Sequence, residues 1–392
     1  MKWPMTKLSE VCQVNPRLPK DSDESQEVSF LAMASVSEDG VLLNQETRIL
    51  GETKKGFTYF ERGDVIVAKI TPCFENGKAA YLDSLQTKIG FGSTEFHVLR
   101  PDIDRLDGKY LFYLIWNDKF RCIAERSMSG SAGQKRVPAK FLQDFSIPLP
   151  PLEEQKRIAA ILDKADTIRQ KRQQAIALAD DFLRSVFLDM FGDPVTNPKG
   201  WDKRPLHEIA SHIVDCPHST PRWTDEGIIA LRTSNLTKGG WDWTDKRFVS
   251  ELEYKERTKR SELVAKDLIL SREGTVGIAA LVPEGVKMCM GQRLVQIRVN
   301  DNHILPEYLL YLILIELEPD RISRLMTGST SKHINVSDLK ALSIMLPPLA
   351  IQNKFVETMT FLNGIKERLA LFDVDSDMAF DAISQKAFSG QL

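Results

Sequence analysis

The chain repeats itself, and this duplication restricts its fold more than any other feature of the sequence. Five short segments of the first half recur in the same order in the second half, at an offset of about 200 residues. The clearest pair is KYLFYLIW at Lys109–Trp116 and EYLLYLIL at Glu307–Leu314. The other matched pairs are Trp3–Val11 with Trp201–Ile209, Gly63–Ile70 with Lys266–Glu273, Met128–Ser131 with Met326–Ser329, and Ser146–Gln155 with Ser343–Gln352. The sequence therefore predicts two copies of one unit of about 195 residues.

Each unit has two parts, and the first part is a lobe, predicted at residues 1–150 and 193–347. Short apolar runs such as Val65–Ala68 alternate there with Gly, Pro, Asn and Asp, which is typical of short, mainly antiparallel strands with a few helices. We expect helices at Tyr110–Trp116 and Tyr308–Glu316, where Asp107 and Pro306 act as start signals.

The second part of each unit is a long helix, predicted at residues 151–192 and 348–392. From Leu152 to Phe191 the chain contains no Gly and no Pro, and Gly192 ends the helix. Its narrow apolar stripe consists of Ile158, Ile161, Ala165, Ile168, Ala175, Ala179, Phe182 and Val186. At 1.5 Å per residue the rod is about 60 Å long. In the second copy Gly364 and the acidic stretch 373–377 interrupt a stripe of Phe355, Met359, Leu362, Ile365, Leu369 and Phe372.

A narrow stripe indicates that each long helix packs against another helix. We therefore predict an α/β (α+β) fold in which two repeated domains are separated by two long helices that form an antiparallel coiled coil. The alternative is two independent amphipathic helices, each packed on its own lobe.

Composition excludes several classes of protein. No apolar run approaches the roughly 18 residues of a membrane span, and the N-terminal segment lacks the apolar stretch of a signal peptide, so we expect a cytoplasmic protein. The five cysteines are scattered and never form a CxxC pair, which argues against disulfides and a zinc ribbon. Residues 1–150 and 191–349 each carry as many acidic as basic residues. Any DNA contact must therefore come from local basic patches.

Motifs of catalysis are missing from the sequence. There is no Asn/Asp-Pro-Pro-aromatic tetrapeptide of an amino-methyltransferase and no GxxxxGK[ST] phosphate loop. Gly274 and Gly277 form a GxxG that we interpret as a tight turn between strands. The potential ligands His207, His212, Cys216 and His218 fit no standard zinc spacing, so we expect neither a metal site nor catalytic residues.

Several segments of the chain resemble conserved segments of a known family. PLPPLEEQKRIAAILDKAD (Pro148–Asp166), followed by Phe182–Trp201, is similar to the central conserved region of specificity subunits of type I restriction–modification systems. IMLPPLAIQNKF and the terminal KAFSGQL resemble their distal conserved region, and SGSAGQKRVPAKFLQDFSIPLPP resembles the end of a target-recognition domain. DCPHSTPR (Asp215–Arg222) resembles a D-G-x-H-x-T-P motif of the family, with Cys216 in place of the glycine.

The resemblance implies a non-catalytic, sequence-specific DNA-binding subunit. It would bind two methyltransferase subunits along the helices, and the complex would add restriction–translocase subunits. The chain would hold no cofactor, because S-adenosylmethionine, ATP and Mg²⁺ belong to the partner subunits. Because the lobes are not identical, the target should be bipartite and asymmetric, with half-sites about one turn of DNA apart. A coiled-coil scaffold for protein partners and an unrecognised DNA-modifying enzyme are the alternatives.

Candidate DNA contacts are side chains that can clamp phosphates or reach base edges. The best patch is Ser129–Arg136, where two glycines, two hydroxyls, an amide and two cations are contiguous, and Thr327–His333 is its counterpart. The full set of candidates is Lys69, Thr71, Ser93, Thr94, Ser129, Gly130, Ser131, Gln134, Lys135, Arg136, His218, Ser219, Thr220, Arg232, Asn235, Ser271, Arg272, Gln292, Arg293, Thr327, Gly328, Ser329, Ser331 and Lys332.

Overall fold

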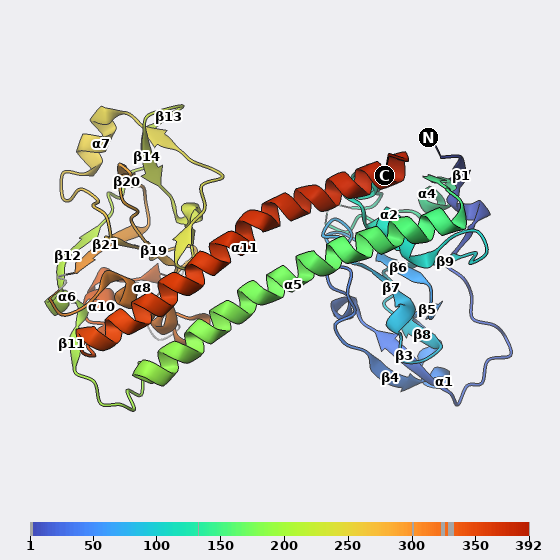
Figure 1. Cartoon of the computed structure of the whole chain (residues 1–392), viewed down its shortest axis with the longest axis horizontal. Coiled ribbons are helices and arrows are strands. Elements are labelled where there is room, and N and C mark those ends of the chain that lie inside the picture. Colours follow the sequence, from blue (N-terminus) through green and yellow to red (C-terminus); the bar gives the residue numbers. More distant parts are fainter. Residues whose placement is uncertain (1–2, 132, 300–301, 323–325, 328–332, 392) are drawn as a thin grey trace. The chain divides into compact units, whose positions relative to one another are not determined.

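The computed structural model divides the chain into two compact units. Unit 1 comprises residues 1–175 and 369–392, and unit 2 comprises residues 176–368. Each unit contains one lobe and one end of each of two long helices, α5 (Leu152–Phe191) and α11 (Leu349–Ser389), which Figure 1 shows as continuous rods. The described residues are 3–131, 133–299, 302–322, 326–327 and 333–391.

The lobe of unit 1 is built on two four-stranded sheets. In order across each sheet, the strands are β2 (Cys12–Val14), β9 (Phe96–Pro101), β6 (Val65–Ala68) and β7 (Ala79–Tyr81), and β4 (Glu46–Ile49), β3 (Glu27–Leu31), β8 (Ile89–Gly92) and β5 (Thr58–Glu61). A short ladder pairs β1 (Met5–Lys7) with β10 (Ser146–Pro148). The strands pair antiparallel apart from β3 and β8, which run parallel.

The lobe of unit 2 repeats this plan. Its four-stranded sheets contain β12 (Ala210–Asp215), β21 (Leu294–Val299), β18 (Leu268–Ser271) and β19 (Ala279–Leu281), and β13 (Trp223–Thr224), β17 (Phe248–Val249), β14 (Ile228–Leu231) and β20 (Met288–Met290). The short ladders pair β11 (Lys203–Pro205) with β24 (Ser343–Met345), β15 (Leu236–Thr237) with β16 (Gly240–Trp241), and β22 (Met326–Thr327) with β23 (His333–Ile334). The parallel pair β14–β20 corresponds to β3–β8. The predicted duplication and mixed fold class are confirmed.

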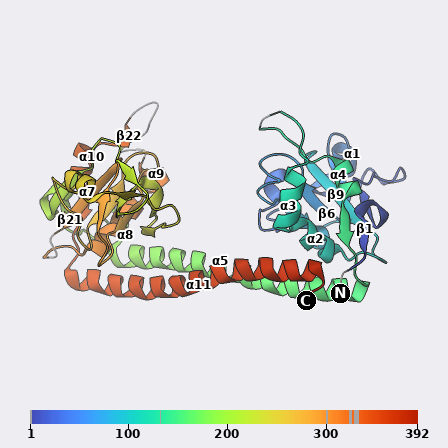
Figure 2. The ribbon, with the colours of Figure 1, turned by 90° about the horizontal axis from the view of Figure 1, so that it is seen from above.

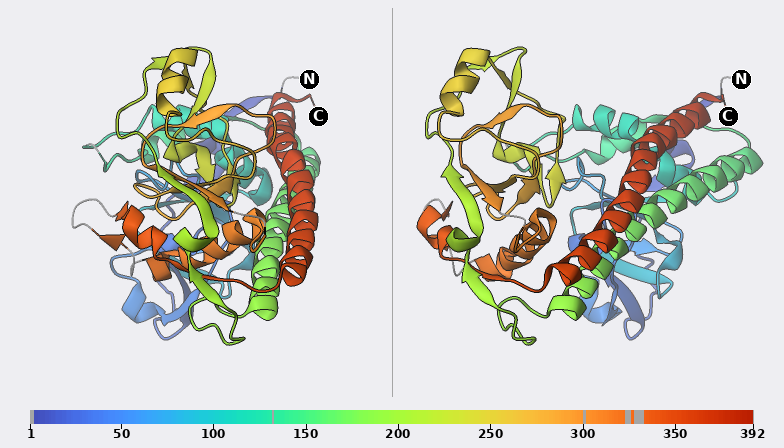
Figure 3. Two further views of the ribbon diagram at one scale, coloured as in Figure 1. Left: turned by 90° about the vertical axis from the view of Figure 1, so that its left-hand side faces the viewer. Right: turned by 60° about the vertical axis from the view of Figure 1, so that its left-hand side comes forward.

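Short helices connect the strands. They are α1 (Leu50–Thr53), α2 (Gly108–Trp116), α3 (Asp118–Glu125), α4 (Ala139–Asp144), α6 (Leu206–Ile209), α7 (Glu251–Arg257), α8 (Pro306–Glu316), α9 (Pro319–Ile322) and α10 (Val336–Lys340). In unit 2, helix α7 lies on the side of the lobe away from the long helices (Figure 3).

Helices α2 and α8 are the predicted apolar helices, and both are almost wholly buried. The carboxylate of Asp107 accepts a hydrogen bond of 2.9 Å from the Tyr110 N–H, and Pro306 begins α8, as the sequence indicates. A helix that is apolar all round needs cover on every side. In Figure 2, α2 lies between strands β6 and β9 and the long helices, and α8 is placed in the same way in unit 2.

Aromatic contacts join these helices to the long ones. In unit 1, the ring of Tyr110 on α2 lies 5.5 Å from Phe388, near the end of α11. In unit 2, the ring of Tyr308 on α8 lies 4.9 Å from Phe191, at the end of α5, and Phe191 lies 5.5 Å from Phe355, near the start of α11. The end of one long helix therefore meets the start of the other, and the predicted antiparallel pairing is confirmed within each unit.

The predicted apolar stripes are only partly correct. Ile158 is buried, but Ile168 and Phe182 are exposed, and α5 instead buries Leu183 and Phe187 in unit 2. In unit 2 the buried face of α5 lies one residue further along the chain than predicted, because α5 packs against the core of the lobe as well as against α11. On α11, Phe355, Met359 and Leu362 are buried as predicted, whereas Ile365 is partly exposed.

A further feature of the long helices is clear. Helix α11 continues through Gly364, so the predicted interruption there is wrong.

The helices within the described ranges include none that is long and apolar enough to cross a membrane.

A buried glutamine ties each long helix to its lobe. The Gln155 side chain accepts a hydrogen bond from the Asp107 N–H (2.9 Å) and donates to the carbonyls of Arg105 and Pro150, both at 2.9 Å. Gln352 repeats this arrangement: it accepts from the Leu305 N–H (2.9 Å) and donates to the carbonyls of His303 (3.1 Å) and Pro347 (2.8 Å). The repeated PPLxxQ segment is therefore the joint between lobe and helix.

Replacing this glutamine should destabilise the fold. In Gln155→Leu the Asp107 N–H and two carbonyls lose their partner inside the core, so we expect the free energy of unfolding to fall by about 2 to 4 kcal/mol. Urea denaturation of the full chain measures the change. Lys171→Ala, at an exposed position of the same helix, should change stability by less than about 0.5 kcal/mol. Equal effects of the two substitutions would contradict the role of the joint.

Candidate nucleic-acid interface

Three predicted DNA-contact segments of lobe 1 lie side by side. They are residues 69–71, 93–95 and 129–136, which we call the lobe-1 edge cluster. The Lys69 N–H donates to the Glu95 carbonyl (2.8 Å), and the Thr71 N–H donates to the Lys135 carbonyl (3.0 Å). Backbone hydrogen bonds of the strand ends, rather than side chains, thus bring these segments together.

Ser129 and Arg136 close a loop of lobe 1, of which residues 129–131 and 133–136 are described. Ser129 and Arg136 exchange two backbone hydrogen bonds of 2.8 and 3.0 Å. Gly130 has φ +130°, and a Cβ there would lie 2.7 Å from the Gln134 carbonyl oxygen, so the loop requires glycine. The side chains of Ser129, Ser131, Gln134 and Lys135 are exposed. The loop therefore offers hydroxyl, amide and ammonium groups on a fixed backbone.

Glu95 sits at the centre of the lobe-1 edge cluster. The guanidinium of Arg136 donates two hydrogen bonds to this carboxylate, at 2.8 and 2.9 Å. The hydrogen bond from Arg136 holds the pKa of Glu95 below its usual value, with a smaller contribution from Lys69. Arg136 is thus partly neutralised, and Lys69 and Lys135 supply the remaining positive charge of the cluster.

A buried histidine supports the same loop, and sequence reasoning missed it. His97 Nε2 lies 2.7 Å from the Val137 carbonyl oxygen, so this nitrogen carries the proton, and Nδ1 lies 3.1 Å from the Asn15 amide. Burial lowers the pKa of His97. Nothing in the local sequence marks this residue, because Asn15 reaches it only through strand pairing.

Lobe 2 has an equivalent cluster. Residues 215–220, 271–273 and 291–293 meet there, together with His333 and Ile334, and we call them the lobe-2 edge cluster. The Arg272 N–H donates to the Arg293 carbonyl (3.1 Å), and the Ile334 N–H donates to the Arg272 carbonyl (3.0 Å).

The same pair of backbone bonds occurs in lobe 1, where the Val137 N–H donates to the Lys69 carbonyl at 2.9 Å. Lys69 therefore corresponds to Arg272, and Glu95 corresponds to Arg293. The two clusters share these two backbone hydrogen bonds, and they differ in the sign of the charge at the position of Glu95 and Arg293.

Buried arginines position the loops of lobe 2. Arg272 donates to both carboxylate oxygens of Asp215, at 3.1 and 3.2 Å, and its side chain is 10% exposed. Arg257 on α7 donates to the carbonyls of Met290 (2.9 Å), Gly291 (2.7 Å) and Ser219 (3.1 Å). Sequence reasoning missed Arg257, because it belongs to a highly charged helix that reads as a solvated surface.

Some predicted contact residues are used inside the lobe. Ser271 is buried and donates to the Glu273 carbonyl at 3.1 Å, and Asn235 is buried and accepts from the Arg232 N–H at 3.0 Å. Together with the internally paired Arg272, these side chains are not available to DNA. Arg232 itself is ion-paired with Asp245. The hydroxyl of Thr71 donates to Glu75 at 2.8 Å.

The other candidates divide into open and undescribed positions. Thr94, His218, Ser219, Thr220 and Arg293 are exposed, whereas Lys69, Ser93 and Gln292 are half-buried. The predicted residues Gly328, Ser329, Ser331 and Lys332 lie outside the described residues, and only the backbone of Thr327, in β22, is described.

The remaining motifs have structural roles. Cys216 is buried, and its Sγ accepts from the Leu294 N–H at 3.4 Å; its backbone is not left-handed, so the loop does not require the family's glycine. Gly274 and Gly277 lie in the turn between β18 and β19, as predicted. Within the described ranges, no group of three or more His, Cys, Asp or Glu side chains is placed to hold a metal ion.

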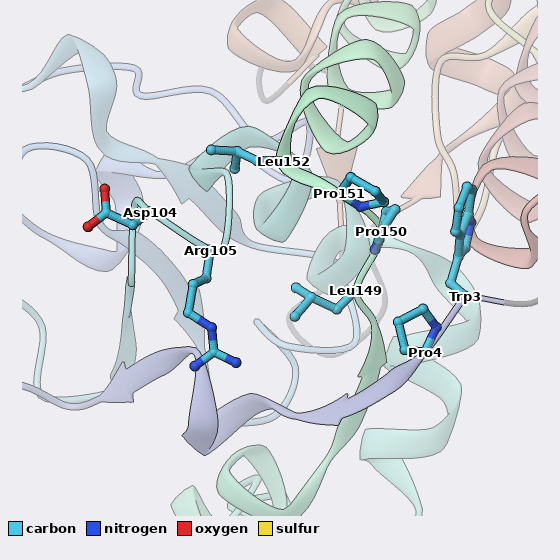
Figure 4. A pocket seen from close by; sticks show the side chains of 8 residues that line it. All are labelled: Trp3, Pro4, Asp104, Arg105, Leu149, Pro150, Pro151 and Leu152. Carbon is cyan, nitrogen blue, oxygen red and sulfur yellow. The ribbon is translucent and has the colours of Figure 1, made fainter.

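A hollow of about 550 Å³ lies in unit 1, away from the predicted contacts (Figure 4). It is lined by Trp3, Pro4, Asp104, Arg105 and Leu149–Leu152. Its lining contains none of the candidate DNA-contact residues.

Comparison with known families identifies the class of this protein. The model of the family described as type I restriction modification DNA specificity domain matches residues 1–178 and 198–369. The chain therefore belongs to this family, and it is a DNA-binding specificity component of a restriction–modification system. The family is defined by DNA specificity and not by methyl transfer or cleavage, which agrees with the expectation of a non-catalytic chain.

Individual relatives agree with this assignment. The chain is 26% identical to the Escherichia coli type I restriction enzyme EcoEI specificity subunit, over 91% of this chain and 77% of the relative. It is 45% identical to the E. coli EcoAI specificity subunit over 40% of this chain and 26% of the relative. The fold is similar to that of the type I S subunit from M. genitalium, with a TM-score of 0.58 and 14% identity over 98% of this chain and 96% of the other.

The burial of His97 should make lobe 1 sensitive to acid. Because its pKa is lowered in the folded state, the unfolded chain takes up a proton first as the pH falls below about 6.5. The free energy of unfolding should thus be highest above this pH. It should decrease as the pH falls from about 6.5 to the lower folded-state pKa of His97. Denaturant unfolding at pH 7.5 and pH 5.5 should show a smaller difference for His97→Gln than for the wild type. His212→Gln, at an exposed position, should keep the wild-type difference.

Proposed function

We propose that this chain reads a bipartite, asymmetric DNA target and directs methyltransferase and restriction subunits to it. Each lobe would read one half-site. The observation that carries the proposal is the repeated edge cluster: in both lobes, the same backbone hydrogen bonds assemble segments that the sequence independently marks as DNA contacts. Family membership supports the same reading.

The exposed groups of each cluster suit different parts of a DNA duplex. Lys69, Lys135 and the hydroxyls of Ser129 and Ser131 in lobe 1 would contact phosphates, which position a protein without reading sequence. Gln134 in lobe 1 and Arg293 in lobe 2 have paired donors or acceptors that can reach base edges. The carboxylate of Glu95 neutralises part of the charge of Arg136. This agrees with a lobe that has no net charge and would bind DNA through a local basic patch.

The clusters differ in their side chains, and this difference supports an asymmetric target. Position 95 carries a carboxylate, whereas the equivalent position 293 carries a guanidinium. Two lobes that share the same backbone hydrogen bonds but carry different side chains would recognise different bases at corresponding places.

The partners are part of the same proposal. Two methyltransferase subunits would bind along α5 and α11, and restriction–translocase subunits would complete the complex. S-adenosylmethionine, ATP and Mg²⁺ would be held by those subunits. The compartment would be the cytoplasm, where the chromosome is accessible to such a complex.

Methylation mapping tests the proposal. The chain is expressed together with the methyltransferase encoded beside it, and methylated adenines are located across the genome. We expect one bipartite motif with a fixed spacer, which disappears when this chain is omitted. Methylation that does not depend on the chain would contradict the proposal and favour a protein-binding scaffold, and metal-dependent cleavage of DNA by the isolated chain would favour an enzyme. DNA binding by the complex should also weaken steeply with salt.

The long helices should act as a ruler between the half-sites. Removing seven residues, about two turns, from the 160–185 region of α5 and the matching seven from α11 shortens each helix by about 10 Å. We expect the spacer to shorten by about three base pairs, since DNA rises about 3.4 Å per base pair, while both half-sites stay the same. Methylation mapping reads the result. Altered half-sites, or an unchanged spacer, would contradict the ruler; Lys171→Ala should leave the motif unaltered.

A further inference from the structure

Arg293 has a backbone conformation that is unfavourable for its side chain. It lies in the turn between β20 and β21 with φ +66°, in the left-handed region. The described non-glycine residues in this region are Asn15, Asn197, Lys266 and Arg293. Asparagine tolerates the conformation well, but an arginine is disfavoured there and glycine would fit without strain. Strained residues persist where the surrounding structure fixes them, and they occur preferentially at functional sites.

The surroundings of Arg293 do fix its backbone. Its carbonyl accepts the hydrogen bond from the Arg272 N–H at 3.1 Å, and the preceding Gln292 side chain donates to the His218 carbonyl at 2.8 Å. Arg257 holds the carbonyls of Met290 and Gly291 just before it. The turn is therefore rigid on both sides of Arg293, and the side chain starts from a fixed point.

Unlike the arginines beside it, Arg293 is open to solvent. Arg272 is held by both oxygens of Asp215, and Arg257 is committed to backbone carbonyls. The Arg293 side chain is 59% exposed, and its Nε lies 3.5 Å from an oxygen of Glu273, a carboxylate that Arg272 shares at 3.3 Å. A loose, shared ion pair at an exposed site contributes little to stability. Internal packing therefore does not explain why an arginine occupies this strained position.

We propose that Arg293 reads a guanine in the half-site bound by lobe 2. A guanidinium donates two parallel hydrogen bonds to O6 and N7 of guanine in the major groove, and this is the commonest specific contact between an arginine and DNA. Such a contact needs a side chain with two parallel donors on a fixed backbone position. The guanidinium of Arg293 has the two donors, and the turn fixes its backbone. The equivalent position in lobe 1 carries Glu95, which cannot donate to guanine. The inference rests on the proposed function, because it assigns one base contact within that target.

The test uses the complete chain with its methyltransferase partner and three variants, Arg293→Gly, Arg293→Lys and Lys266→Gly. Arg293→Gly removes the side chain and relieves the left-handed strain, so its melting temperature should equal or exceed that of the wild type. Its methylation motif should keep the lobe-1 half-site and lose selectivity at one G·C pair of the lobe-2 half-site, with discrimination reduced about 10- to 100-fold. Arg293→Lys keeps the positive charge but not the two parallel donors, so it should reduce base selectivity at the same position of the motif.

Lys266→Gly is the matched control, because Lys266 lies in the same lobe with φ +68° and pairs with Glu307. It should leave the motif unchanged. The inference is overturned if Arg293→Gly keeps full selectivity, broadens an A·T position, or lowers methylation equally at all sites, as a phosphate contact would. If Arg293→Gly fails to fold, unchanged selectivity in Arg293→Lys overturns it. Failure of the proposed function is distinct, since the wild-type chain would then yield no bipartite motif at all.

Discussion

The burial of helices α2 and α8 is the constraint on which the rest of the structure depends. Each is apolar on nearly all sides, so it is stable only where the sheet covers one side and the long helices cover the other. The rings of Tyr110 and Tyr308 join each helix to the ends of α5 and α11. Lobe and helix ends therefore share one core in each unit, and neither part can bury its apolar surface alone.

The hydrogen bonds at the joint between lobe and long helix are the same in both units. Gln155 and Gln352 each satisfy one backbone N–H and two carbonyls where the chain passes from the lobe into the helix. Buried backbone groups without partners are costly, so this single side chain fixes the direction in which each helix leaves its lobe.

The two edge clusters combine the same backbone hydrogen bonds with different exposed side chains. Main-chain bonds between strand ends assemble the cluster in both lobes, so its exposed side chains can differ without loss of these bonds. The side chains are consequently free to differ: Glu95 neutralises Arg136 in lobe 1, while the equivalent Arg293 stays open in lobe 2. Buried supports such as His97 and Arg257 hold the loops from behind, without taking part in the exposed surface.

The sequence by itself determined the duplication, the fold class, the start signals of α2 (Asp107) and α8 (Pro306), and the extent of α5. The duplication follows from the segments that recur in both halves, and the helix limits follow from local periodicity, capping and the absence of Gly and Pro. It also marked the segments that meet in the edge clusters, because the repeat placed similar polar residues at matched positions. Only the tertiary structure decided which of those side chains remain open.

Ser271, Asn235 and Arg272 have the chemistry of DNA contacts, yet each is buried and bonded within the lobe. Arg257 and His97 look unremarkable in the sequence, yet they position the loops. The physical reason is the same in each case: the role of a polar side chain depends on the partner that strand pairing brings to it from tens of residues away. Local sequence patterns carry no information about that partner.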